Sequence, residues 1–399
     1  MSAFGINIQD FGAVGDNVTD DTAAIQHAID QAQGFPVFVP PRRFRITKKL
    51  LVANTPVTLV GAGSTGMGPG PAAVTTDNVS VISATFDGGA ALEFTGLHPC
   101  TVRGIQFRGA AVNSTSGAAI RIVGANSAGL PATNAGSIIE NCGFVDFHTP
   151  IQIVRGAQHN ITGNRFSNWI DKAIRNETTI GVEGSPGYID KNWFFGNETG
   201  QQTAIYSETG YITIDNNHIL NGLKGVELSI KNGPAGRPVI VDNILENQRH
   251  SSILVSSRDG SVCSMLRISR NEISNVEFAA SAVAAICIEA YGSLINHAPW
   301  ISDFDIEDNI LRSQMPTESK YIWVQSGQRF AISRNRIVNL GSGTPQGIQI
   351  RGVANNLELV PAAPPDNYEQ QVLIFDNAIS GTTQKHNFAP GLDMTSRLL

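Results

Sequence analysis

One pattern of apolar and polar positions recurs along most of the chain. An Ile or Val is followed by two residues, an Asn, one more residue, and then an Ile, Leu or Phe, as in "ITGNRF" from residue 161 and "ISRNEI" from residue 268. The Asn position of this repeat, including two copies without Asn, falls at Ile105, Cys142, Asn164, Asn192, Asn217, Asn243, Asn271, Asn309, Asn335 and Asn377. Most successive copies are 22 to 28 residues apart, and longer spacings indicate the same unit with an inserted loop.

A second recurring element lies between these copies, in which apolar residues alternate with other residues after a small one. Examples are "AAIRIV" from 118, "KGVELS" from 224 and "AAICIE" from 284. Alternation with a period of two predicts β-strands, and the Asn falls where a turn should join two of them. The pattern therefore predicts a parallel β-helix, a solenoid of parallel strands, with the Asn side chains stacked in a ladder. A β-sandwich or a propeller is the alternative, but propeller blades need longer repeats.

The N-terminal stretch has a different period. Ile25, Ala28, Ile29 and Ala32 form an apolar helical stripe, with Thr19 or Asp20 as candidates for the helix cap. Because a solenoid exposes its core and a strand edge at each end, we expect this helix to cover the first rung. We expect one all-β domain over residues 1–399, with the cap and first strands in 1–60, the coils in 61–380 and a C-terminal tail in 381–399.

Composition narrows the classes of function. The chain has 399 residues, 41% of them hydrophobic and 16% charged, which excludes a disordered chain. The net charge of -6 argues against nucleic acid as a partner. Four cysteines without metal-type spacing predict neither a disulfide framework nor a metal site. We find no apolar run long enough to span a membrane and no secretory signal in "MSAFGINIQD".

The stretch "DFGAVGDNVTDDTAAIQHAID", with "VFVPPRRFRI" and "LVGAG" after it, resembles the N-terminal region of the pectate-lyase-like superfamily of right-handed β-helices. That superfamily includes polygalacturonase-like glycosidases, alginate epimerases and phage tailspikes that cut polysaccharides. The resemblance implies a right-handed parallel β-helix that acts on or binds carbohydrate, in an extracellular or virion-associated setting and as a homotrimer like the tailspikes. The signature residues of polygalacturonases and the Asp-Pro-His-Glu of alginate epimerases are not found here, so the resemblance carries over no catalytic residue.

The repeat itself indicates where chemistry could occur. In the alternating strands, two columns of side chains should point outward, and stacked coils should bring residues of one column about 4.8 Å apart. One column contains Arg175, Tyr206, Glu227 and, further along, Trp323; the other contains Glu177 and Glu208. Glycoside hydrolysis needs two carboxylates, one as an acid and one as a nucleophile or base. We therefore predict catalysis by Glu177, Glu208 and Glu227, with substrate bound by Arg175, Tyr206 and Trp323. The alternative is a solvated face whose acids are neutralised by Arg175, Lys172 and Lys224.

A second candidate pair, Asp190 and Asp215, follows the aliphatic residue of two successive repeats. These carboxylates could form the catalytic pair, bind a cation, or be ordinary polar turn residues. Exposed aromatic rings can pack on the apolar faces of sugars, and the candidates are Trp169, Trp193, Trp300, Trp323, Tyr188, Tyr206, Tyr211, Tyr291 and Tyr321.

Three hypotheses of function follow. The first is a glycoside hydrolase or transglycosylase acting on a polysaccharide or oligosaccharide, without metal or cofactor. The second is a polysaccharide lyase acting on a uronate polymer, which would bring in Ca²⁺. The third is a glycan-binding tailspike or adhesin module without catalysis. None of them involves nucleic acid or a membrane.

Overall fold

The computed structural model describes residues 5–53, 55–64, 78–110, 116–124, 126–127, 130–131, 134–177, 187–198, 200–231, 234–235, 237–258, 261–275, 284–291, 300–314, 319–325, 327–343, 345–350, 372–382 and 384–388. The chain divides into two compact units, Met1–Asn197 and Glu198–Leu399, called here the N-terminal and C-terminal units. The side chains of the candidate aromatic residues Tyr291 and Trp300 lie outside the described part of the structure. Among the helices of the described residues, none is long and apolar enough to cross a membrane.

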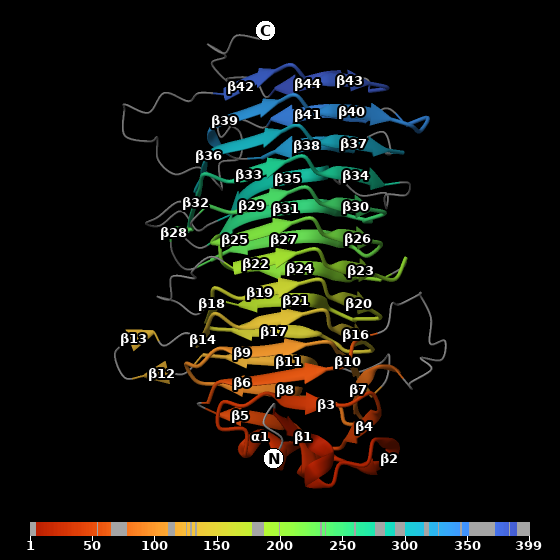
Figure 1. Ribbon diagram of the computed structural model, residues 1–399. Coiled ribbons are helices and arrows are strands. Elements are labelled where there is room, and N and C mark those ends of the chain that lie inside the picture. Colours follow the sequence, from red (N-terminus) through yellow and green to blue (C-terminus); the bar gives the residue numbers. More distant parts are fainter. Residues whose placement is uncertain are drawn as a thin grey trace. The chain divides into compact units, whose positions relative to one another are not determined.

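Each unit consists of three parallel sheets that the chain visits in a fixed order (Figure 1). Sheet 1 holds the strand before the Asn position, sheet 2 the strand directly after it, and sheet 3 the alternating strand that completes the coil. Parallel neighbours separated by one coil, with right-handed crossovers, define a right-handed parallel β-helix. The all-β solenoid predicted from the repeat is thereby confirmed.

In the N-terminal unit, the described strands are as follows. Sheet 1 contains β1 (Ile6–Asn7), β3 (Val37–Val39), β6 (Val57–Gly61), β9 (Cys100–Arg103), β15 (Ile138–Glu140), β19 (Asn160–Thr162) and β22 (Gly187–Asp190). Sheet 2 contains β2 (Asp16–Asp20), β4 (Arg43–Ile46), β7 (Ser80–Ala84), β10 (Ile105–Arg108), β16 (Gly143–Val145), β20 (Arg165–Ser167) and β23 (Trp193–Phe195). Sheet 3 contains β5 (Leu50–Ala53), β8 (Ala90–Thr95), β11 (Ala118–Val123), β17 (Ile151–Val154) and β21 (Lys172–Glu177). Two short pairs are added by β12 (Asn126–Ser127) with β13 (Leu130–Pro131), and by β14 (Asn134–Ala135) with β18 (Gly156–Ala157).

The C-terminal unit repeats the same order. Sheet 1 contains β25 (Ile212–Asp215), β29 (Val239–Val241), β33 (Arg267–Ser269), β36 (Trp300–Glu307), β39 (Gln328–Ser333) and β42 (Val372–Phe375), and β36 also pairs with β32 (Val262–Ser264) and through it β28 (Pro234–Ala235). Sheet 2 contains β26 (His218–Leu220), β30 (Ile244–Glu246), β34 (Glu272–Asn275), β37 (Ile310–Ser313), β40 (Arg336–Asn339) and β43 (Ala378–Ser380). Sheet 3 contains β24 (Thr203–Ser207), β27 (Lys224–Ile230), β31 (Ser251–Arg258), β35 (Ala284–Tyr291), β38 (Lys320–Val324), β41 (Gln346–Ile350) and β44 (Gln384–Phe388). Strand β44 pairs with β41, so sheet 3 extends into the segment expected to be a tail.

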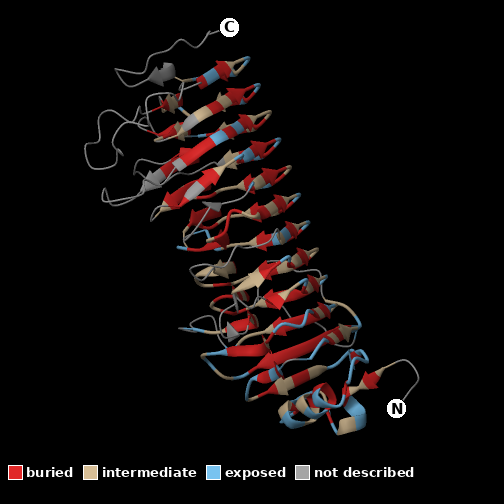
Figure 2. Ribbon diagram, turned by 90° about the vertical axis from the view of Figure 1, so that its left-hand side faces the viewer, coloured by how far each residue is buried: buried red, intermediate tan, exposed pale blue. Residues whose placement is uncertain are grey.

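The helix at the N-terminal end is short and amphipathic. The 3-10 helix η1 (Ile8–Phe11) precedes it, and α1 (Thr22–Asp30) contacts η1 and β5. The predicted stripe of Ile25, Ala28, Ile29 and Ala32 is buried, whereas much of the opposite side of α1 is exposed (Figure 2). The predicted cap is wrong in detail. Asp21 is the N-cap, and its carboxylate accepts hydrogen bonds from the N–H groups of Val14 and Gly15 rather than from the helix.

The Asn positions form the predicted ladder within each unit. In the C-terminal unit, the backbone N–H and the side-chain amide of each Asn both donate to the carbonyl oxygen of the next Asn side chain, at 2.9 to 3.1 Å, along Asn217, Asn243, Asn271, Asn309, Asn335 and Asn377. In the N-terminal unit, Asn164 makes the same two bonds to Asn192. The left-handed backbone belongs to the residue before each Asn, as at Asp242, Arg270 and Asp308. The Asn itself contributes hydrogen bonds, because its buried carboxamide satisfies backbone groups that the turn leaves open.

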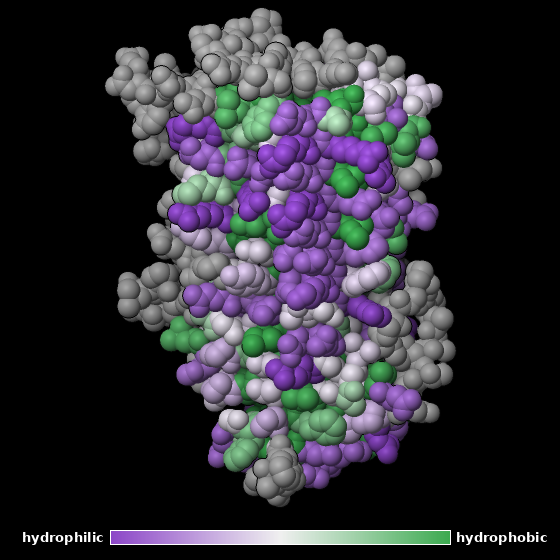
Figure 3. All heavy atoms as spheres, turned by 45° about the horizontal axis from the view of Figure 1, so that its top comes forward, coloured by the Kyte–Doolittle hydropathy of each residue, from purple (hydrophilic) through white to green (hydrophobic). Residues whose placement is uncertain are grey.

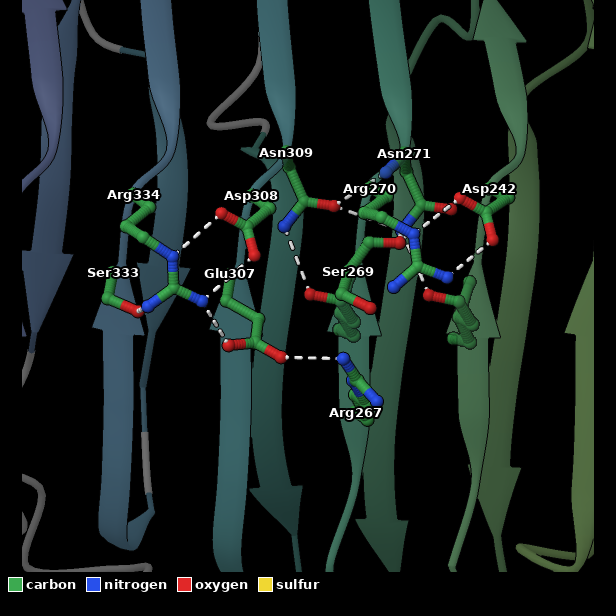
Figure 4. Close-up of polar contacts among 12 residues, drawn as sticks. Asp242, Arg267, Ser269, Arg270, Asn271, Glu307, Asp308, Asn309, Ser333 and Arg334 are labelled. Atoms are coloured by element: carbon green, nitrogen blue, oxygen red, sulfur yellow. Dashed lines mark hydrogen bonds and ion pairs between the residues drawn. The ribbon is translucent and has the colours of Figure 1, made fainter.

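The residues in these left-handed turn positions carry alternating charges along part of the C-terminal unit (Figure 4). Arg270 binds Asp242 through two nitrogens at 2.7 and 2.6 Å, and Arg334 binds Asp308 in the same way at 2.8 and 2.9 Å. Glu307 joins Arg334 to Arg267, at 2.6 and 3.0 Å. Oppositely charged side chains therefore connect successive coils outside the ladder. Figure 3 shows a band of hydrophilic residues on the face that it draws.

Stacked aromatic rings fill part of the interior of the N-terminal unit. Phe107, Phe144, Phe166 and Phe194 point inward from sheet 2, and their successive ring centroids are 5.6, 5.0 and 4.6 Å apart. Trp169 packs edge-on against Phe194 and is buried, so it is a core residue and not a sugar-binding one. In the C-terminal unit, Tyr321 is also buried, with its hydroxyl donating to the Ser313 carbonyl at 2.8 Å. The candidacy of these two rings for sugar binding was therefore wrong.

Candidate functional site

Sheet 3 has the register that the sequence pattern predicts. In the N-terminal unit, Arg121, Gln152 and Arg175 are successive partners, and Val154 is the partner of Glu177. In the C-terminal unit, the outward column runs through Tyr206, Glu227, Leu254, Cys287, Trp323 and Gln349. Glu177 belongs to the N-terminal unit, and Glu208 and Glu227 belong to the C-terminal unit.

In the N-terminal unit, Glu177 ends β21 and is held by two side chains. Arg175 contacts one of its carboxylate oxygens at 2.5 Å, and the amide of Gln152 donates to the other at 3.0 Å. Arg175 also lies 3.5 Å from Asp171, which Lys172 contacts at 2.7 Å. This part of the face therefore presents ion-paired groups, with Arg175 placed between two carboxylates.

In the C-terminal unit, Glu208 follows β24 and lies in a compact group with Tyr206 and Lys231. The Tyr206 hydroxyl donates to Glu208 Oε1 at 2.8 Å, and Lys231 Nζ contacts the same oxygen at 2.8 Å. Burial, followed by the bond to Glu208, raises the pKa of Tyr206, and the bond to Glu208 raises the pKa of Lys231. At neutral pH the phenol therefore keeps its proton and the amine its charge, and both act as donors to Glu208.

Glu227 lies on the next rung, on β27. Its carboxylate contacts Lys224 Nζ at 2.9 Å, and its side chain is only 11% exposed, as the side chain of Glu208 is 12% exposed. His250 lies close by, and burial, together with the charge of Lys224, lowers its pKa. Tyr206 is the register partner of Glu227, so Glu208 lies on the diagonal, two residues further along. One rung and two strand residues place the two backbones about 8 Å apart.

The same outward column becomes apolar further along the C-terminal unit. Leu254, Ala284 and Cys287 form a buried cluster, and Trp323 packs against it. Lys320 Nζ lies 4.6 Å from the centroid of the Trp323 ring. Four rungs separate Trp323 from Tyr206 in this column, or roughly 19 Å. Trp323 is thus on the predicted face, although its ring is partly covered.

Three further polar groups on sheet 3 were not among the predicted site residues. Lys231 follows Glu227 and Ser229 in the same alternation, so extending the outward column by one position would have found it. Glu289 accepts a hydrogen bond from the Gln325 amide at 3.1 Å and is mostly buried. Glu93 contacts Lys49 at 2.6 Å and Arg121 at 3.4 Å in the N-terminal unit. Its coil precedes the first recognisable copy of the repeat, so the pattern gave no signal there.

The second candidate pair lies on a different sheet. Asp190 ends β22 and Asp215 ends β25, both on sheet 1 of their respective units. Asp190 contacts Lys191 at 3.4 Å, and Asp215 accepts a hydrogen bond from the Asn216 amide at 3.0 Å. Within the described part of the chain, no cluster of three or more His, Cys, Asp or Glu side chains is arranged to hold a metal ion.

Comparison with known proteins agrees with the parallel β-helix described above. Three parallel sheets visited in this repeating order define a right-handed parallel β-helix of the pectate-lyase-like class. The family described as "Rhamnogalacturonase A/epimerase, pectate lyase-like" matches residues 5–229, and the chain belongs to this family.

Individual relatives share shorter stretches of sequence or only the fold. A pre-neck appendage protein of Bacillus phage B103 is 39% identical over 64 residues, which are 16% of this chain and 7% of that protein. The A-module of the Azotobacter vinelandii mannuronan C-5 epimerase AlgE6 is 15% identical with a TM-score of 0.63, covering 96% of this chain and 99% of the module. A tailspike protein of E. coli bacteriophage HK620 is 12% identical with a TM-score of 0.63, covering 95% of this chain and 67% of the tailspike. These two structures are similar to this chain in fold.

Proposed function

We propose that the protein is a glycoside hydrolase that cleaves a polysaccharide on the outer face of sheet 3, with Glu208 and Glu227 as its catalytic carboxylates. The observation that carries the proposal is the placement of these two side chains on adjacent rungs of one sheet, with Tyr206 between them. Membership of a carbohydrate-active β-helix family supports a polysaccharide or oligosaccharide as the substrate. The phage relative and the tailspike fold support a place outside a cell or on a virion.

The spacing of the two carboxylates favours an inverting reaction. Inverting enzymes hold their carboxyl groups roughly 6.5 to 9.5 Å apart, leaving room for a water molecule, and the diagonal between Glu208 and Glu227 is about 8 Å at the backbone. One carboxyl group would give its proton to the glycosidic oxygen as the bond to the anomeric carbon breaks. The other would take a proton from the water that attacks that carbon from the opposite face.

The neighbouring groups suit this task. Tyr206 and Lys231 both donate to the same oxygen of Glu208, which fixes the carboxylate and leaves its second oxygen for substrate or water. Lys224 holds Glu227 in a comparable way. Because both carboxylates are largely shielded from solvent, their interactions with a developing positive charge on the sugar ring are stronger than they would be in water.

A panel of polysaccharides incubated with the protein tests the proposal, with products identified by mass spectrometry. We expect saturated oligosaccharides from at least one substrate, and loss of that activity by about 10²- to 10⁴-fold in Glu208→Gln and in Glu227→Gln. Glu246→Gln is the matched control, because Glu246 is a carboxylate on sheet 2 of the same unit that contacts the His218 ring. Products with a 4,5-unsaturated bond, which absorb in the ultraviolet, would instead establish a lyase, and full activity in Glu208→Gln would exclude this site.

A further inference from the structure

The N-terminal unit carries an exposed aromatic surface on sheet 2. Trp193 and Phe195 point outward from β23, with ring centroids 6.0 Å apart and an angle of 27° between the ring planes. The Trp193 side chain is 45% exposed, although a tryptophan in a folded protein is usually well buried. Two nearly parallel rings on neighbouring outward positions therefore present a flat apolar surface to solvent.

The backbone under this surface is rigid. Phe194, between the two outward rings, is fully buried and stacks on Phe166 at 4.6 Å. Asn192, directly before Trp193, belongs to the Asn ladder and donates to the Ile161 carbonyl at 2.8 Å. Tyr188, on the other side of this turn, is 52% exposed. A ligand that binds here would meet a strand that its buried neighbours already hold in place, so little backbone entropy is lost on binding.

A cation lies next to the rings. Arg165, on β20, is the register partner of Trp193 and is half-buried. Several other arginines of this unit contact carboxylates, as Arg103 contacts Glu140 and Arg121 contacts Glu93. Within the described part of the chain, Arg165 has no carboxylate at ion-pair distance. The positive charge beside the aromatic surface is therefore uncompensated.

We propose that Trp193, Phe195 and Arg165 form a binding site for an acidic polysaccharide, separate from the carboxylates of sheet 3. The apolar face of a pyranose ring packs on the indole, and a uronate carboxylate on the same or the adjacent sugar pairs with the guanidinium. The side chains of Tyr188 and Asp190, on the sheet 1 side of the turn, offer a further ring and a hydrogen-bond acceptor for sugar hydroxyls. This site holds the polymer without cleaving it and does not depend on the hydrolysis proposed above.

The ligand follows from the combination of features. An exposed aromatic surface alone would suit a second protein chain. A flat ring beside an unpaired guanidinium instead matches a uronic acid, whose apolar ring face packs on the aromatic ring and whose carboxylate pairs with the guanidinium. A sulfated sugar shares the negative charge, so sulfated polymers must be compared with uronate polymers. A second copy of this chain is the remaining occupant to be tested.

Binding is measured in the Glu208→Gln background, so that cleavage does not remove the ligand. Affinity electrophoresis or calorimetry compares the binding of four polymers: polygalacturonate, alginate, chondroitin sulfate and dextran. We expect retention by at least one uronate polymer, about tenfold or more weaker binding in Trp193→Ala, and a comparable loss in Arg165→Gln. Leu340→Ala and Arg336→Gln are the matched controls, because both residues are exposed in the C-terminal unit.

Three outcomes would overturn the proposal. The first is equal binding by the Trp193→Ala variant and its parent. The second is that the protein binds neutral dextran but no acidic polymer, and that Arg165→Gln does not change the binding of dextran. The third is a change in molar mass on light scattering in Trp193→Ala, which would make the surface an interface between copies. Cleavage by the wild-type chain is scored separately, so failure of the hydrolase proposal leaves this test intact.

Discussion

The Tyr206 hydroxyl lies 2.8 Å from Glu208 Oε1, and Lys231 approaches the same oxygen from the next rung. Two donors on one oxygen orient the carboxylate, so in the proposed active site Tyr206 would position Glu208. Tyr206→Phe removes one donor and keeps the ring. We expect kcat to fall about 10-fold while folding is retained, because a hydrogen bond to a charged group is worth roughly 1.5 to 3 kcal/mol.

The Asn ladder should be a major source of local stability. Asn271 accepts hydrogen bonds from the N–H and the side-chain amide of Asn243, and it donates to the Ile240 carbonyl at 2.9 Å. Asn271→Ala leaves these buried groups unsatisfied, at about 1 to 3 kcal/mol for each unpaired group. We expect a clearly lower melting temperature, whereas Glu272→Ala, at the adjacent exposed position, should change it little. Equal melting temperatures for the two variants would contradict the structural role of the ladder.

The sequence pattern was sufficient for the fold because it is set by local alternation and by one buried turn residue per coil. The same pattern predicted whether a side chain points inward or outward only within regular strands. Trp169 follows β20 in a turn, where alternation no longer applies, and it points into the core. The partners of each carboxylate were harder to predict, because Lys231 reaches Glu208 from another rung through a flexible side chain. Sequence also does not show which outward positions are covered, as Leu254 and Cys287 are.

The charged turns should make stability depend on pH. The hydrogen bonds from Arg334 lower the pKa of Asp308, and those from Arg329 lower the pKa of Asp303. A carboxylate with a lowered pKa in the folded state stabilises the fold above its unfolded pKa of about 3.9, and this contribution is lost as the pH falls below it. We expect Arg334→Gln to reduce the melting temperature at pH 7 more than at pH 3. Arg336→Gln serves as the control and should show no such difference, because Arg336 has no carboxylate at ion-pair distance among the described residues.

We propose that the chain forms a homotrimer, as the resemblance of its N-terminal region to the superfamily that includes phage tailspikes implies. Light scattering at micromolar concentration should then give the mass of three 42.5 kDa chains. Dilution to nanomolar concentration separates a tight assembly from a weak one, since association depends on protomer concentration. A mass close to a single chain at every concentration would exclude the trimer, and the proposed sites within each unit would be unaffected.

His159 gives the sharpest test of the core of the N-terminal unit. Its ring is buried, neither ring nitrogen has a hydrogen-bond partner among the described residues, and burial lowers its pKa to about 4. The unfolded chain, with a histidine pKa of about 6.5, binds a proton that the folded chain does not, so stability falls as the pH decreases from 6.5 towards 4. His159→Phe fills the same space without a titrating group, and we expect it to flatten the melting temperature between pH 7 and 4.5. His148→Phe, at a half-buried histidine of the same unit, is the matched comparison and should keep the wild-type slope. A His159→Phe protein that loses as much stability as wild type over this range would show that His159 takes up its proton in the folded state.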